Sequence, residues 1–278
     1  MKTHVVAFLF LACLCAKAEA PSAAWYTYYY MDPQPDKFTT EVRNMSQKGD
    51  LTKVDAQQPL IAFFSRVMAQ NPDKISPWMK ELENLPPNDK RVLYSAIWFS
   101  NTPQGKEFFI TNKLPGYLKK EPPDILKTQP DSPSSLDMLW GYFMATGDPK
   151  AIRGIVSALS LSKDEGALAR FKNTQKTDED KKAAYLDAAF QAARNSLTSN
   201  CLQHPKVMEI CETLYKSNEL NKAESAELNN ILAKVAPDRY TAKPTGIKPP
   251  APEAAPKAAT TPKPPVSPPK GGPKPLLY

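Results

Sequence analysis

Histidine and cysteine are scarce in this 278-residue sequence, which contains two histidines and four cysteines. Only His204, Cys201 and Cys211 lie beyond the first 20 residues. Their spacing matches no structural zinc pattern, and a fourth protein ligand is missing. A general acid–base role for His204 needs a partner carboxylate and a cleft, and the sequence places neither beside it. We therefore expect no metal, no cofactor and no catalytic residue.

Glycine is also scarce, with ten residues, and none of them forms part of a phosphate-binding loop or a Gly-x-Ser-x-Gly motif. The acidic run Asp178-Glu179-Asp180 falls in the first turn of an expected helix, where it complements the helix dipole. These features favour a protein that is not an enzyme. The alternative is a cell-wall glycan hydrolase with two facing carboxylates, for example Glu81 or Glu83 against Glu107.

Long hydrophobic runs are absent after the N-terminus. The run from Val5 to Cys15 is too short to span a hydrocarbon core of roughly 30 Å as a helix. It follows the basic Lys2 and ends near the small residues around Ala20, as a secretory signal does. Residues 1–20 are therefore predicted to be a cleaved signal peptide, with a lipoprotein anchored at Cys13 as the alternative. We expect a protein of the periplasm, or a secreted one, with no membrane span in the mature chain.

Residues 241–278 have a different composition from the rest and show neither helical nor strand periodicity. They carry 12 of the chain's 29 prolines. Such a segment cannot bury a core, so it is predicted to be a disordered tail. Its lysines are expected to contact an anionic cell-wall polymer or a protein partner. These lysines are Lys243, Lys248, Lys257, Lys263, Lys270 and Lys274.

The positive charge belongs mainly to this tail. Six lysines against Glu253 give the tail +5 of the chain's formal +7, and residues 1–20 contribute +1. About +1 is left for residues 21–240, so the sequence gives no indication of a basic face on the folded part. A nucleic-acid partner is therefore not expected.

Residues 21–240 read as helix throughout, because their apolar residues recur at steps of three and four. Helix starts are expected at Asp55, at Thr102-Pro103 and at Asn221, which has Glu224 three residues later. Five prolines interrupt the pattern in residues 114–133. We expect an N-terminal helical subdomain at 21–113, a structureless connecting loop at 114–133 and a C-terminal helical subdomain at 134–240.

The clearest stretch runs from Ser134 to Leu161. An apolar stripe that includes Leu139 and Phe143 ends at Gly147, and Asp148-Pro149 opens a second stripe. Two helices joined by so tight a turn are expected to form an antiparallel hairpin. The predicted fold is therefore all-α, with such hairpins stacked as an irregular α-solenoid or helical bundle.

A long helix after Thr177 is expected to bury the row Tyr185, Ala189, Ala193, Leu197 and Cys201. Cys211 lies about two turns into the next helix, so the two cysteines would be offset by about one turn, or 5 Å, in an antiparallel pair. That separation is near the limit for a disulfide. The sequence leaves two interpretations open, a structural disulfide or two buried thiols that serve as small apolar side chains.

The segment Trp25–Tyr30 is rich in aromatic residues and is stopped by Asp32-Pro33. We expect it to pack its aromatic side chains into grooves between helices. A strip that stacks on sugars is the alternative.

Two resemblances follow from these residues. The hairpin resembles a tetratricopeptide pair in its packing style, since Phe143 and Gly147 fit that motif's aromatic and turn glycine, although Trp140 replaces a glycine and Ile152 an alanine. Residues 136–143, 196–200 and His204-Pro205 resemble uncharacterised exported α-helical proteins of Gram-negative bacteria. That resemblance implies an envelope location and no particular activity.

The sequence thus predicts an exported helical scaffold or adaptor that binds a protein partner in the cell envelope. Stacked hairpins present long surfaces suited to peptides and helices. Such a protein would support an envelope assembly or secretion apparatus, and would matter to host interaction if it comes from a pathogen. The alternatives are a surface tether held to anionic polymer by the tail, and the glycan hydrolase.

Overall fold

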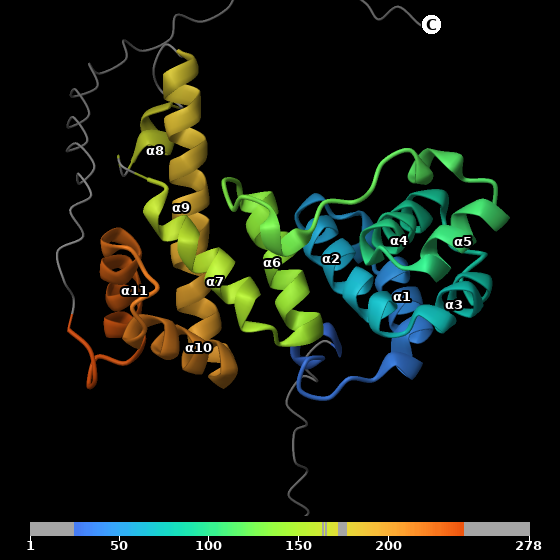
Figure 1. The fold of residues 1–278 in the computed structure, drawn as a ribbon, viewed down its shortest axis with the longest axis horizontal. Coiled ribbons are helices and arrows are strands. Elements are labelled where there is room, and N and C mark those ends of the chain that lie inside the picture. Colours follow the sequence, from blue (N-terminus) through green and yellow to red (C-terminus); the bar gives the residue numbers. More distant parts are fainter. Residues whose placement is uncertain (1–24, 163, 165, 172–176, 242–278) are drawn as a thin grey trace, which may run out of the picture.

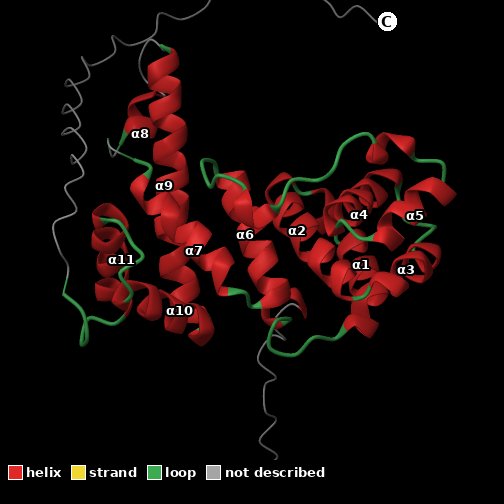
Figure 2. Ribbon diagram, viewed as in Figure 1, coloured by secondary structure: helices red, strands yellow, loops and turns green. Residues whose placement is uncertain are grey.

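The computed structural model describes residues 25–162, 164, 166–171 and 177–241 (Figure 1). This part of the chain is all-α and contains no β-strand, as predicted (Figure 2). The eleven α-helices of the described residues are α1 (Phe38–Gln47), α2 (Val54–Gln70), α3 (Ile75–Glu81), α4 (Pro87–Ser100), α5 (Pro103–Thr111), α6 (Pro133–Thr146), α7 (Pro149–Ser157), α8 (Ala167–Phe171), α9 (Asp178–Gln203), α10 (Pro205–Lys216) and α11 (Lys222–Val235). None of these helices is long and apolar enough to cross a membrane.

The helices enclose two apolar cores. The first lies among α1 to α5, and its largest fully buried side chains include Phe38, Phe64 and Phe109. The second lies among α6, α7, α9, α10 and α11 and includes Phe143 and Ile155. The two groups of helices lie side by side in Figure 1, with α2 and α6 where they meet.

Helices α2 and α6 approach so closely that their backbones touch. A Cβ atom added at Gly141 of α6 would lie 2.0 Å from the carbonyl oxygen of Pro59 in α2 and 3.0 Å from Cβ of Ala62. Ala62 belongs to the second core, and Ala145 of α6 belongs to the first. Each helix therefore contributes to the core of the other group, and the division into two subdomains stays a prediction.

Most of the predicted helix starts are confirmed. The Thr102 hydroxyl accepts a hydrogen bond from the backbone of Gly105, and Asn221 forms a capping box with Glu224. The start predicted at Asp55 is wrong, because α2 begins one residue earlier and Asp55 lies in its first turn. That position still places a negative charge where the helix dipole favours it.

The hairpin of α6 and α7 is built as its sequence indicates. Gly147 takes the left-handed conformation with φ of 67°, and the Asp148 side chain accepts a hydrogen bond from the backbone of Lys150. Leu139 of α6 packs against Gly154 of α7, where an added Cβ would lie 3.1 Å from the leucine. The tetratricopeptide-like style of packing and the solenoid arrangement stay predictions.

The Pro-rich connecting loop predicted at 114–133 joins α5 to α6, and it is not structureless. The segment contains two 3₁₀ turns, η5 (Pro115–Leu118) and η6 (Ile125–Lys127). The ring of Tyr117 stacks on Phe109 at 4.6 Å, and Ile125 is buried in the second core. Prolines break the helical pattern there, but the apolar residues between them still find places in both cores.

The predicted row on α9 is correct from Ala189 to Cys201 and wrong at its first member. Tyr185 is 67% exposed, and it lies on the end of α9 that extends past α7 and α11 beside α8 (Figure 1). The predicted signal peptide at 1–20, the anchor at Cys13 and the tail at 242–278 lie outside the described residues.

Candidate binding groove

The aromatic segment Trp25–Tyr30 packs into the helical body, as expected. The side chain of Tyr29 is only 1% exposed. The indole of Trp25 makes edge-to-face contacts with Tyr29 and Phe63, with ring centroids 5.1 and 5.2 Å apart. Such pairs stabilise an arrangement beyond the burial of their apolar area. One side of the segment is thus anchored in the first core.

The other side of the segment is anchored in the second group of helices. The backbone N–H of Tyr30 donates to the carbonyl of Met144, at 3.0 Å. The Tyr28 hydroxyl donates to the carbonyl of Gln203 at 3.3 Å, and the Tyr30 hydroxyl shares a hydrogen bond of 3.4 Å with Nδ1 of His204. The segment therefore links the first core, the end of α6 and the turn between α9 and α10.

A groove runs along this segment where it crosses α2 and α6. One hollow of about 460 Å³ is lined by α2, α6 and the end of α9, and a second of about 590 Å³ adjoins it. Tyr26, Met45 and Asp50 line both hollows, so they are parts of one groove. The wall of the first hollow is mainly apolar and includes Leu60, Phe63, Trp140 and Met144. Its volume is in the range of about 300–1,000 Å³ that is usual for ligand sites.

Two carboxylates lie near each other on α2 and α6: Asp55, which lines the first hollow, and Asp137. Asp50 is paired with Lys53 at 2.6 Å. By contrast, neither Asp55 of α2 nor Asp137 of α6 forms a hydrogen bond or an ion pair with any residue in the described part of the chain. Burial, together with the charge of Asp55, raises the pKa of Asp137 to about 6. A cation beside both would relieve this repulsion.

The aromatic residues beside the groove include buried hydrogen-bond donors without acceptors in the described part of the chain. The indole N–H groups of Trp25 and Trp140 and the hydroxyl of Tyr29 are buried, and none has a partner within the described ranges. Trp140 lines the first hollow and Trp25 the second. A buried donor without an acceptor costs about 1–3 kcal/mol, and such groups often mark a site that a ligand or water completes.

His204 is a structural residue at the turn where α10 begins. Its side chain is buried against the rings of Tyr28 and Tyr30, with centroids 4.8 and 6.1 Å away. Burial lowers its pKa, which favours the neutral imidazole. Both rings that it touches come from the aromatic segment, so His204 holds that segment in place.

Cys201 and Cys211 are brought together, as the sequence suggested. Both are buried free thiols, and a hydrogen bond between them together with burial raises the pKa of Cys211. The sequence left a disulfide and two thiols as alternatives, and thiol titration of the denatured, unreduced protein decides between them. Within the described residues, no three His, Cys, Asp or Glu side chains are grouped so that they could hold a metal ion.

The acidic residues suggested for glycan hydrolysis lie on α3, just after α3 and on α5. Glu81 pairs with Arg43 and accepts a hydrogen bond from Thr39, which places it at the contact of α1 and α3. Glu83 lines a hollow beside α3 and α4, and Glu107 accepts a hydrogen bond from Thr111 within α5.

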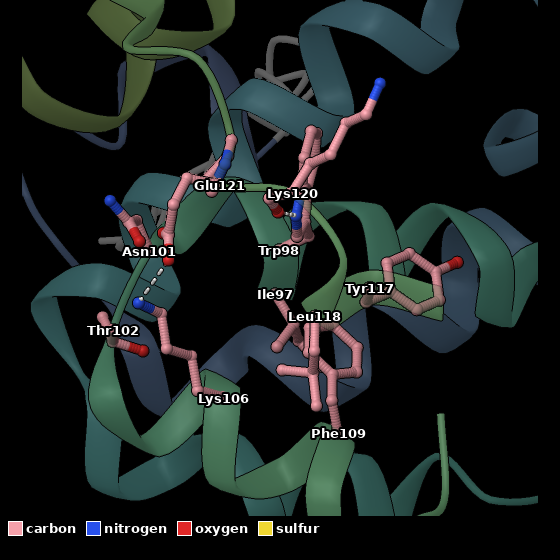
Figure 3. A pocket seen from close by; sticks show the side chains of 11 residues that line it. Ile97, Trp98, Asn101, Thr102, Lys106, Phe109, Tyr117, Leu118, Lys120 and Glu121 are labelled. Atoms are coloured by element: carbon pink, nitrogen blue, oxygen red, sulfur yellow. Dashed lines mark hydrogen bonds and ion pairs between the residues drawn. The ribbon is translucent and has the colours of Figure 1, made fainter. Parts of the chain in front are cut away.

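A separate hollow, outside the groove, lies under the connecting segment and is too small for a peptide (Figure 3). Its volume is about 60 Å³, room for only a few water molecules. The Trp98 indole donates to the carbonyl of Lys120 at 2.9 Å, and Lys106 pairs with Glu121 at 3.0 Å across it. These contacts hold the connecting segment on α4 and α5, so we assign this hollow a structural role.

Sequence reasoning missed Asp55 and Asp137 as neighbours. Asp55 was interpreted as a helix cap. Asp137 lies between Leu136 and Leu139, whose apolar periodicity was interpreted without considering the acid. An acidic residue next to the apolar face of a helix was the signal that could have indicated it. The pairing itself depends on the close approach at Gly141, which no periodicity reveals.

Comparison with protein-family models, with curated proteins and with solved structures found no match to this chain. The functional interpretation is therefore based on the residues that line the groove.

Proposed function

We propose that this protein is a non-enzymatic exported scaffold that binds an extended segment of an envelope protein in the groove beside the aromatic segment. The observation that supports this most directly is the groove wall, where Tyr26, Phe63 and Trp140 are gathered with two methionines. Aromatic and methionine side chains are enriched in the centres of protein interfaces. Export, and a role in an envelope assembly or secretion apparatus, come from the sequence features of residues 1–20 and from the resemblance.

The test compares two tyrosines. Tyr26 is 38% exposed in the groove, and Tyr185 is 67% exposed on α9, far from it. Mature wild type, Tyr26→Ala and Tyr185→Ala are used to capture proteins from an envelope extract. We expect one or more proteins to be retained by wild type and by Tyr185→Ala but lost with Tyr26→Ala, at unchanged melting temperature.

Capture of the same proteins by all three forms would exclude the groove as the binding site. Capture that is lost only when the tail is removed would instead support the surface tether. A peptide scan of the captured partner would then define the bound segment.

A second candidate function, hydrolysis of a cell-wall glycan, is favoured by one observation. Asp137, with its pKa raised to about 6, lies close enough to Asp55 for their charges to interact, and Asp55 lines the aromatic groove. Glycosidases use such a pair, one carboxyl protonated and one ionised. Release of soluble sugar from purified cell wall by wild type, and its loss in Asp137→Asn, would establish this activity and replace the scaffold proposal.

A further inference from the structure

The groove is suited to a ligand with apolar rings and few hydrogen-bond donors, because Tyr26, Phe63 and Trp140 line its first hollow. A proline-rich segment has this character, because each proline keeps its carbonyl and lacks an N–H. Such segments adopt an extended left-handed helix and dock in grooves lined by aromatic side chains.

The groove is also suited to a basic ligand. Asp50 and Asp55 line its first hollow, and Asp137 of α6 lies close enough to Asp55 for their charges to repel. Lys53 also lines this hollow, but it is paired with Asp50 at 2.6 Å, so the acids at this end outnumber the bases. A lysine or arginine brought in by a ligand would gain charge-assisted hydrogen bonds to these carboxylates.

The chain itself contains a segment with both properties. Residues 262–270 read Pro-Lys-Pro-Pro-Val-Ser-Pro-Pro-Lys, with Lys263 and Lys270 on either side of two proline pairs. No acidic residue lies within this segment, and the only acid of the tail is Glu253.

We infer that the groove formed by the aromatic segment, α2 and α6 is a docking site for residues 262–270 of the same chain. The prolines lie against Tyr26 and Trp140, and Lys263 or Lys270 reaches Asp55 and Asp137. The inference rests on the proposed function, because the tail segment and the envelope partner then compete for one groove.

The tail is long enough to reach the groove. The described chain ends at Thr241, whose carbonyl accepts a hydrogen bond of 2.6 Å from Asn229 of α11. In Figure 1, α11 and α2 lie on opposite sides of α6. The residues from 242 to 262 span about 60 Å at ~3.1 Å each in an extended form. A compact chain of this size has a radius of gyration of about 17 Å, so that span is sufficient.

The experiment places a photoreactive side chain in the groove of the full mature protein. Tyr26→p-benzoylphenylalanine is irradiated, and the cross-linked peptides are identified by mass spectrometry. We expect cross-links to residues 262–270. An equal mixture of unlabelled and ¹⁵N-labelled chains should give no mixed products, because the contact is within one chain. The measurement is repeated with p-benzoylphenylalanine at Lys53, at the rim, where the aromatic wall stays intact. Tyr185→p-benzoylphenylalanine is the control.

Charge reversal tests the role of the carboxylates. Lys263→Glu with Lys270→Glu should lower the cross-link yield about tenfold. A tenfold change corresponds to a loss of roughly 1.4 kcal/mol in the free energy of docking. Lys243→Glu with Lys248→Glu has the same change in net charge and should leave the yield within about twofold. Absence of cross-links to 262–270, cross-links only between chains, or equal effects of both double variants would each overturn the inference.

Partner capture separates this inference from the proposed function. If the tail occupies the groove, Lys263→Glu with Lys270→Glu should increase capture of the envelope partner, since the competitor is weakened. If cross-links are absent while capture still depends on Tyr26, the tail inference fails and the proposed function stands. If cross-links occur and no partner is captured, the proposed function fails and the docking of the tail stands.

Discussion

At the scale of single residues, the pH dependence of stability depends in part on Asp137 of α6. Its carboxyl is half-buried beside Asp55, and both burial and that neighbouring charge disfavour the ionised form. The folded protein therefore binds this proton more tightly than the unfolded chain does. In such a case the stability falls as the pH rises from about 4 through about 6.

We predict that Asp137→Asn stabilises the protein at pH 7 by about 1 kcal/mol and leaves it unchanged near pH 4. The pKa shift alone would suggest more, but solvent screens a half-exposed group. Urea denaturation at the two pH values measures the difference. Asp238→Asn changes an exposed aspartate outside the groove and is the control. A destabilised Asp137→Asn at pH 7 would show that this carboxylate has a stabilising partner.

His204 has the opposite pH dependence. Burial lowers the pKa of His204, so the folded protein favours the neutral ring. The contribution of His204 to stability is therefore fully present above the usual pKa of about 6.5 and is lost as the pH falls below that value. We predict that the melting temperature of wild type drops more between pH 7.5 and 5.5 than that of His204→Gln. The contribution of Asp137 is common to both proteins and cancels. An equal drop in the two would contradict this account.

At the scale of helices, the contact of α2 and α6 is the tightest constraint in the fold. We predict that Gly141→Ala destabilises the protein by about 3 kcal/mol or more, because the added methyl meets backbone atoms that cannot move aside. Gly116→Ala adds the same methyl where no atom lies within 4 Å and should change stability by less than about 0.5 kcal/mol. Chemical denaturation measures both. A cost below about 1 kcal/mol at Gly141 would mean that the helices separate easily.

Local sequence signals predicted the helices well and the contacts between them poorly. The cap at Thr102 and the turn at Gly147 follow from interactions within four residues, so the sequence alone defines them. The contact of Gly141 with Pro59 joins residues far apart in the chain, and glycine has no side chain to mark the site. The groove depends on that contact, which is why its apolar residues were interpreted only as core.

The connecting segment shows the same limit. Its prolines correctly predicted the end of helical structure, but loops with prolines need not be loose. Tyr117 and Ile125 fix the segment through contacts with Phe109 and with the second core. Those contacts are set by the packing of whole helices and cannot be derived from residues 114–133 themselves.

At the scale of the whole molecule, the two cores are coupled through the aromatic segment as well as through α2 and α6. Tyr28 and Tyr30 contact the α9–α10 turn, while Trp25 and Tyr29 are held in the first core. A single cooperative unit is expected from such coupling.

We predict that wild type unfolds in one calorimetric transition and that Tyr28→Ala with Tyr30→Ala broadens or splits it. The second group of helices would then unfold at a lower temperature than the first. Tyr185→Ala removes an exposed tyrosine of α9 and should leave one transition. If the double variant keeps equal calorimetric and van't Hoff enthalpies, coupling through α2 and α6 is sufficient by itself.

The backbone contact at Gly141 also has an evolutionary consequence. Substitution at an exposed helix position is tolerated, so the surface residues of this chain are free to diverge. A side chain at position 141 would push α6 away from α2, and a larger one at 62 would do the same from the other side. Diverged relatives are therefore expected to share a glycine and a facing alanine at these two places even where little else is alike.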